Sequence, residues 1–169
     1  MAENRLTASV ITVSDSSHRG ERADLSGPAV CSALQAKGFT VGGTEIVPDD
    51  RTSIENALIE WANRVNLVVT TGGTGLALRD VTPEATASVC DRLVPGLPER
   101  MRIEGARRAP RAALSRGLCG VRNSTLILNL PGSPTAAVDS LNIVIDLLPH
   151  AIDLLKGQTA HDPVPGARY

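Results

Sequence analysis

Short apolar runs alternate with helical patterns along most of the chain. Four runs are short and rich in aliphatic or β-branched residues, which is typical of buried strands. The second run is the weakest of them, because Gly42 and Gly43 interrupt it. The third is continuously apolar, as expected for a strand covered on both faces of a sheet. The predicted strands are residues 7–14, 39–50, 66–71 and 124–130.

The segments between the first three strands have the period of amphipathic helices. In residues 26–38, Val30 and Leu34 lie one helical turn apart, and Gly38 is suited to end the helix. The pattern is clearest in residues 52–65, which we expect to begin at an N-cap, Thr52 or Ser53. The apolar face of that helix is formed by Ile54, Leu58, Trp61 and Val65.

The remaining helical patterns lie on either side of the fourth strand. Residues 81–93 are predicted as a helix with Thr82 at the N-cap and Pro83 at the first helical position. Residues 97–109 extend this helical region. After the fourth strand, residues 133–157 keep a helical apolar pattern despite Pro149.

Alternation of strands and helices predicts an α/β fold with right-handed crossovers. We expect a three-layer α/β/α sandwich around a mostly parallel central sheet. Residues 1–156 are predicted to form a single domain, and residues 157–169 a loose polar tail.

Composition narrows the possible partners. The chain has 169 residues, 42% of them apolar, and a formal net charge of −1, so it resembles an ordinary globular domain without a basic excess. We therefore expect no nucleic acid and no membrane as partners. The three cysteines form no CxxC pair, and no apolar run is long enough to span a bilayer. A cytoplasmic protein with reduced thiols is expected.

Polar and glycine-rich segments follow each predicted strand. They read SDSSHRG, PDD, TGGTGLALRD and PGSP in chain order. Ligands of open parallel sheets bind at the carboxyl ends of the strands, near a switch in strand order. The sequence therefore predicts a binding site built from these four segments.

The TTGGTG loop is the first candidate within that site. Gly72, Gly73 and Gly75 could expose consecutive amides that bind an anion. The spacing matches neither the P-loop nor the dinucleotide fingerprint. A tight connection that needs positive φ would explain the glycines equally well.

Carboxylates at separate strand ends favour a metal-bound phosphate ligand. Asp15 follows the first strand, Asp49 and Asp50 follow the second, and Asp80 follows the third. Magnesium prefers a few carboxylates together with phosphate oxygens. Each of these residues taken singly also fits an ordinary turn.

Other polar residues near the strand ends admit a structural explanation. Gly132 and Ser133 could bind an anion at a helix N-terminus, although Ser133 is also an ordinary N-cap. Arg79 could contact a phosphate or pair with a neighbouring acid. Ser115 lacks the surroundings of a catalytic serine, and no histidine has a paired spacing, so a hydrolytic triad is not supported. A solvated helical face is the simpler interpretation of most of the cluster Arg107, Arg108, Arg111 and Arg116.

Taken in order, the motifs TVSD, SGP, VPDD, TTGGTG, RDVTPEAT, LSR and LILNLPGSP closely resemble the MogA/MoaB family of molybdenum cofactor biosynthesis. The resemblance extends from about residue 6 to residue 155, and the gephyrin G domain is similar. It implies a molybdopterin adenylyltransferase, which uses magnesium and transfers AMP from ATP to molybdopterin with release of pyrophosphate. It also implies a homotrimer.

The resemblance also assigns roles to individual residues. Asp80 and Asp49 match two functional aspartates, implied in catalysis and in holding magnesium. Gly105 departs from some relatives, which carry a hydroxyl residue at the pterin site. The implied ligand-binding residues are Gly72, Gly73, Thr74 and Gly75 at the phosphates, Ser14, Asp15, Pro131, Gly132 and Ser133 near the nucleotide, and Ser115 and Asn129 on the molybdopterin side.

Two further hypotheses remain open beside the enzyme. One is a MoaB-type paralogue with weak catalysis, which binds molybdopterin as a carrier or as an assembly partner for a MoeA-type metal-insertion protein. The other is a generic nucleotide-binding regulator. Retention of both Asp49 and Asp80 favours the enzyme.

Overall fold

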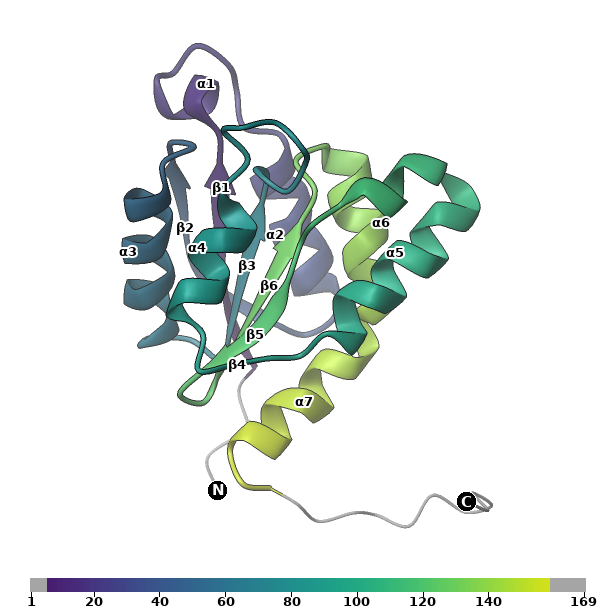
Figure 1. Ribbon diagram of the computed structural model, residues 1–169. Helices are drawn as coiled ribbons and strands as arrows, with labels where there is room; N and C mark the ends of the chain where they lie inside the picture. Colours follow the sequence, from purple (N-terminus) through teal and green to yellow (C-terminus); the bar gives the residue numbers. More distant parts are fainter. Residues whose placement is uncertain (1–5, 159–169) are drawn as a thin grey trace.

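A single six-stranded sheet organises the molecule in a computed structural model, of which residues 6–158 are described (Figure 1). The strand order is β2-β1-β3-β6-β5-β4. The four strands β2, β1, β3 and β6 are parallel, and β5 and β4 continue the sheet in antiparallel pairing. The strands are β1 (Thr7–Val13), β2 (Thr40–Val47), β3 (Leu67–Thr71), β4 (Arg92–Leu93), β5 (Cys119–Arg122) and β6 (Thr125–Leu130).

Helices cover both faces of this sheet. On one face lie α3 and α4, and on the other lie α2, α6 and α7, with α5 packed against α6 (Figure 1). The expected three-layer α/β/α sandwich is confirmed. The helices are α1 (Asp15–His18), α2 (Ser26–Ala36), α3 (Arg51–Ala62), α4 (Thr82–Val89), α5 (Gly96–Arg108), α6 (Pro134–Val144) and α7 (Leu148–Leu155), with 3₁₀ turns η1 (Pro110–Leu114) and η2 (Ile145–Leu147).

The core follows from the alternation of side chains along the strands. On β6, Leu126 and Leu128 face the layer of α2, α6 and α7, whereas Ile127 faces α3 and α4. On β1, Val10 and Ile11 divide in the same way. All of these side chains are essentially fully buried, so both faces of the sheet are covered as its apolar sequence indicates.

Two predicted helix starts are wrong. The N-cap of α3 is Asp50, whose side chain accepts a hydrogen bond from the Ser53 amide at 2.8 Å. Thr82 is already inside α4, and its hydroxyl donates to the Gly72 carbonyl at 3.0 Å. A tertiary partner therefore takes the hydroxyl that local capping would have used.

The chain after α4 also differs from prediction. The helix expected over residues 81–93 ends at Val89, because Arg92 and Leu93 form the edge strand β4. Its partner β5 was not predicted, and a tight turn with Asn123 at φ 52° joins β5 to β6. These strands are too short to show a clear period.

The long helix expected over residues 133–157 is divided by the 3₁₀ turn η2. Pro149 has no amide hydrogen and is incompatible with the interior of a continuous helix. It lies instead in the first turn of α7, where a missing donor is tolerated. The expected tail lies outside the described residues beyond Gln158.

The parallel register brings the carboxyl ends of four strands to one edge. Val13 of β1 is level with Val47 of β2, and Thr71 of β3 is level with both Thr12 and Leu130. The chain leaves β1 toward β2 and returns to β3 on the other side, so the switch in strand order lies between β1 and β3. This is where an open sheet binds ligands.

Within residues 6–158, no helix is both long enough and apolar enough to cross a bilayer.

Burial predicts which apolar side chains maintain the fold. Leu141 of α6 is fully buried, and Leu141→Ala should lower the free energy of unfolding by about 2–5 kcal/mol through lost burial and a residual cavity. Leu154→Ala in α7 is the matched control, because this leucine is 42% exposed and should cost far less. Urea unfolding measures the free energy of unfolding of both variants. Equal losses would contradict the assignment of α6 to the core.

Candidate functional site

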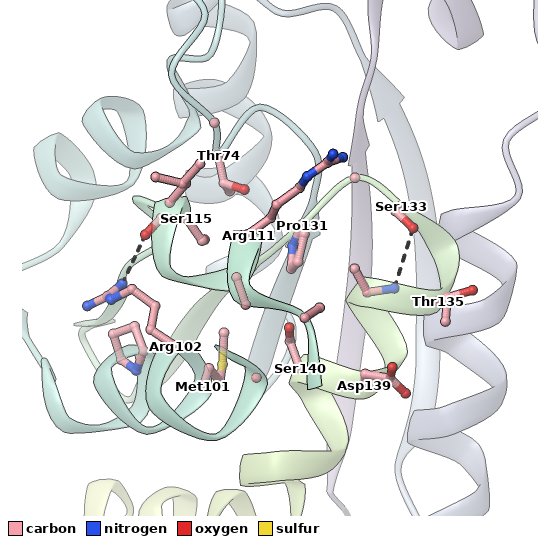
Figure 2. Close-up of a pocket in the computed structure, with 18 of the residues that line it drawn as sticks. Thr74, Met101, Arg102, Arg111, Ser115, Pro131, Ser133, Thr135, Asp139 and Ser140 are labelled. Carbon is pink, nitrogen blue, oxygen red and sulfur yellow. Dashed lines mark hydrogen bonds between the residues drawn. The ribbon is translucent and has the colours of Figure 1, made fainter. Parts of the chain in front are cut away.

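Two adjoining cavities occupy the carboxyl edge of the sheet. The β1-side cavity, of about 480 Å³, lies over the ends of β1, β2 and β3. The α5-side cavity, of about 620 Å³, lies between the glycine loop, α5, η1 and α6 (Figure 2). Four residues line both cavities, so the two form one cleft. They are Gly73, Asp80, Gly132 and Ser133.

Asp15 and Asp49 are joined by two hydrogen bonds, each from the backbone amide of one residue to the carboxylate of the other. The Asp15 amide donates to Asp49 Oδ2 at 2.9 Å, and the Asp49 amide donates to Asp15 Oδ1 at 2.9 Å. This reciprocal pair ties the end of β1 to the end of β2. Asp49 lines the β1-side cavity, whereas Asp15 lines neither cavity, so the structure gives Asp15 the role of holding Asp49.

Asp49 and Asp80 line the same cavity. Burial raises the pKa of the Asp49 carboxyl above its ordinary value of 3.8, and the nearby Asp15 and Asp80 charges add to this rise. The Asp15 amide and Arg79 act in the opposite direction on the same pKa. The edge therefore concentrates negative charge that a cation would stabilise.

The glycine loop passes very close to the neighbouring strand and helix. Gly72 has φ 103°, and a Cβ atom there would lie 2.3 Å from the Val13 carbonyl oxygen. Gly73 has φ 65°, and a Cβ there would lie 2.3 Å from the Thr82 hydroxyl. Both positions require glycine for conformation and for space. The turn interpretation and the binding interpretation are thus compatible, because the same loop forms the floor of both cavities.

Asp80 is placed by its own loop. Its Oδ2 atom accepts the Ala77 amide at 3.0 Å and would lie 2.8 Å from a Cβ on Gly75. Gly75 therefore permits the close approach of the carboxylate. The other carboxylate oxygens of Asp80 and Asp49 accept no hydrogen bond from the described residues, which leaves them available to a ligand.

Two of the predicted ligand-binding serines are N-caps in the structure. Ser14 accepts the Ser17 amide at 3.2 Å, and Ser133 accepts the Ala136 amide at 3.5 Å. Both also line the cleft, and Ser133 lies where α6 presents its N-terminal amides. The capping explanation given for Ser133 is confirmed, Ser14 was not predicted as a cap, and both caps keep the serine backbones at the cleft.

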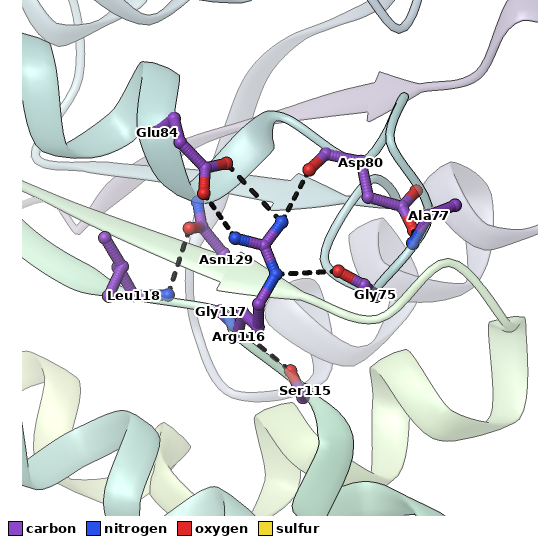
Figure 3. A network of polar contacts seen from close by, with 9 residues as sticks. All are labelled: Gly75, Ala77, Asp80, Glu84, Ser115, Arg116, Gly117, Leu118 and Asn129. Atoms are coloured by element: carbon purple, nitrogen blue, oxygen red, sulfur yellow. Dashed lines mark hydrogen bonds and ion pairs between the residues drawn. The ribbon is translucent and has the colours of Figure 1, made fainter.

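Asn129 is enclosed in the sheet instead of facing a cavity. Its amide nitrogen donates to the Thr70 and Thr86 hydroxyls at 3.0 and 2.9 Å. Its oxygen accepts the Leu118 amide at 3.0 Å, as Figure 3 shows. It is 0% exposed. The structure therefore gives Asn129 a supporting role under the loop that carries Ser115, which itself lines the α5-side cavity.

Most of the arginine cluster is solvent-exposed, as expected. Arg107, Arg108 and Arg111 are exposed, and Arg107 pairs with Glu104. Arg108 and Arg111 also line the α5-side cavity, together with Arg102. Arg116 lies in a polar network beneath the glycine loop (Figure 3). Residue spacing could not reveal this division, because α5 ends at Arg108 and the chain turns at η1.

The cysteines do not contribute a nucleophile to the cleft. Burial raises the pKa of the Cys90 thiol to about 11 and that of Cys119 to about 12, and neither lines a cavity. Thiols with such pKa values carry little thiolate near neutral pH.

A metal could be held here only with help from a ligand. Among residues 6–158, no group of three or more His, Cys, Asp or Glu side chains could hold a metal ion. Two carboxylates that supplement phosphate oxygens suit magnesium, which seldom uses a cage made entirely of protein. The donor set therefore fits a magnesium ion that arrives with a phosphorylated ligand.

The fold and the cleft define an α/β protein that binds small anionic ligands at its topological switch point. Residues 9–150 match the family described as "probable molybdopterin binding domain", and the chain belongs to this family.

Individual relatives agree with this family. The molybdopterin adenylyltransferase of Helicobacter pylori J99 is 42% identical over 88% of this chain and 86% of its own length. The crystal structure of the molybdopterin biosynthesis enzyme MoaB from Thermus thermophilus has a TM-score of 0.85 and 51% identity, covering 90% of this chain and 97% of that one. The tungsten cofactor synthesizing protein MoaB from Pyrococcus furiosus has a TM-score of 0.81 and 32% identity, covering 93% and 99%.

The raised pKa of Asp49 predicts how the stability of an Asp49→Asn variant depends on pH. A carboxyl whose pKa is higher in the folded state contributes stability below its ordinary pKa and loses that contribution as pH rises through the folded value. Asparagine does not titrate and keeps an oxygen for the Asp15 amide. Relative to the wild type, the variant should therefore gain thermal stability between about pH 3 and about pH 7. A relative loss over that range, measured by calorimetry, would contradict the predicted direction.

Proposed function

We propose that the protein is a molybdopterin adenylyltransferase, which transfers AMP from ATP to the terminal phosphate of molybdopterin. The observation that carries this proposal is the joining of two cavities through Gly73, Asp80, Gly132 and Ser133. A transfer between two bound molecules needs two pockets that meet at the reacting atoms. Curated relatives with this name support the chemistry.

Molybdopterin belongs in the α5-side cavity and ATP in the β1-side cavity. The α5-side cavity combines apolar side chains such as Met101 and Leu114 with Arg108 and Arg111, which suits a heterocycle that carries a phosphate. Ser115 lies on the same side. The β1-side cavity carries the Ser14 segment and both carboxylates. In this proposal, the phosphates of both molecules would meet at the shared residues.

The chain supplies position and charge to the transfer. A phosphate oxygen of molybdopterin forms a bond to the α-phosphorus of ATP, and the bond from that phosphorus to the pyrophosphate oxygen breaks. Amides of the glycine loop and of the α6 N-terminus donate to the reacting phosphate, while the shape of the cleft aligns the two molecules. No protein nucleophile is required.

Asp49 and Asp80 are the residues that would hold a magnesium ion brought by ATP. Such an ion neutralises charge on the phosphates during the transfer. The Asp15 amide orients Asp49, and the Ala77 amide orients Asp80, so each carboxylate presents its other oxygen without rearrangement. Both carboxylates are therefore already oriented by backbone hydrogen bonds before a ligand binds.

The MoaB-type carrier remains the second candidate. The 51% identity to the Thermus thermophilus MoaB structure supports a relation to MoaB, although that protein is itself named a biosynthesis enzyme. In this case the protein would bind molybdopterin and hand it to a MoeA-type partner with little catalysis. Incubation with MgATP and molybdopterin distinguishes the carrier from the adenylyltransferase, because only the adenylyltransferase accumulates adenylylated product.

The proposal includes a cytoplasmic homotrimer. The homotrimer is supported by large apolar side chains that remain exposed in the single chain, among them Leu76, Leu78 and Ile103. Sedimentation velocity tests the assembly, and a stable monomer would remove this part of the proposal.

Asp80→Asn tests the central residue. Asparagine still has an oxygen for the Ala77 amide, so the loop is retained while the charge is lost. We expect the rate of product formation to fall by about 100-fold or more, since the lost charge acts where the phosphate reacts. Molybdopterin binding should stay within a factor of about two, because its cavity is built mainly by other residues.

Asp91→Asn is the matched control for this variant. Asp91 also accepts one backbone amide, from Asn123 at 2.7 Å, and it lines neither cavity. The Asp91→Asn variant should form adenylylated product at the wild-type rate. Near-normal turnover by Asp80→Asn would remove Asp80 from the proposed mechanism.

A further inference from the structure

Arg116 connects its own segment to the glycine loop and to the first turn of α4, both of which lie much earlier in the sequence. Its Nε atom donates to the Gly75 carbonyl at 2.8 Å, and one terminal nitrogen donates to the Asp80 carbonyl at 2.6 Å. The other terminal nitrogen pairs with the Glu84 carboxylate on α4. Figure 3 shows these side-chain contacts. The Arg116 backbone amide also donates to the Thr74 carbonyl at 2.9 Å.

The loop held by this guanidinium has few other attachments. In the described part of the chain, the hydrogen bonds that join residues 74–80 to other segments come from Arg116. The Ala77 amide and the Asp80 carboxylate bond only within the loop. At its tip, Leu76 and Leu78 are 66% and 102% exposed in the single chain, so packing within one chain does not replace these hydrogen bonds.

Arg116 does not reach the ligands itself. It lines neither cavity, and its charge is already paired with Glu84. The two carbonyls that it bridges belong to Gly75 and Asp80, the pair whose close approach places the Asp80 carboxylate. Ser115, the residue before it, lines the α5-side cavity. Arg116 therefore stands between the molybdopterin side and the residue expected to hold magnesium.

We propose that Arg116 is the positioning residue of the site: its guanidinium clamps the Gly75 and Asp80 carbonyls together and so sets the Asp80 carboxylate at the junction of the two cavities. This inference rests on the proposed function for its catalytic consequence. A planar guanidinium can serve both carbonyls and Glu84 at once, whereas the single ammonium of lysine cannot reproduce that geometry. Arg116→Lys keeps the charge and removes the clamp.

The experiment combines kinetics with hydrogen exchange. For Arg116→Lys, kcat should fall by about 10-fold or more, and the half-saturating magnesium concentration should rise, because small displacements of a positioned group are costly. The KM for molybdopterin should change by less than about twofold, since the α5-side cavity is built mainly by other residues. Amide exchange should accelerate in residues 75–80 and stay unchanged in β1.

Two variants provide the comparison. Arg122→Lys is the matched control, because Arg122 also donates to a backbone carbonyl, that of Val89 at 2.7 Å, but lines neither cavity. It should leave kcat and exchange in residues 75–80 unchanged. Glu84→Gln keeps the bonds from Arg116 to both carbonyls and should lower kcat by less than about threefold.

The outcomes distinguish this inference from the proposed function. If wild-type protein forms no adenylylated product, the proposed function fails, and exchange in residues 75–80 still decides whether Arg116 holds the loop. If the wild type is active, a kcat and magnesium dependence of Arg116→Lys equal to those of Arg122→Lys would overturn the inference. Unchanged exchange in residues 75–80 would overturn it in either case.

Discussion

The site depends on the level register of the parallel strands. Because Val13, Val47, Thr71 and Leu130 end at one edge of the sheet, the segments that follow them must meet there. The reciprocal hydrogen bonds between Asp15 and Asp49 close this edge on the β1 and β2 side. Asp49, Asp80 and the shared residues of the cleft lie in segments brought together by that register.

Glycine and charge have complementary roles at this edge. Gly72 and Gly73 lie so close to β1 and α4 that any side chain would displace them, and the same closeness puts the loop between the two cavities. Arginines line both cavities, Asp49 lines the β1-side cavity, and Asp80 lies where the two cavities meet. ATP with its cation and the anionic molybdopterin could therefore meet at Asp80 from different sides.

The residues at this edge were easier to predict from the sequence than the residues that hold them in place, such as Asn129 and Arg116. The glycine loop and both aspartates were identifiable because strand ends carry their own local signals. The role of Asn129 depends on contacts with Thr70 and Thr86, and that of Arg116 on carbonyls about 40 residues away, which no local pattern encodes. The strand β5 was missed for a related reason, since its pairing partner, not its own period, makes it a strand.

A crystal structure with a nonhydrolysable ATP analogue and molybdopterin would show whether the two ligands meet at the junction of the two cavities. We expect the α-phosphate beside Gly73, Asp80 and Gly132, with the nucleotide in the β1-side cavity and the pterin in the α5-side cavity. Binding of both molecules in one cavity, or phosphates remote from Asp80, would contradict this expectation.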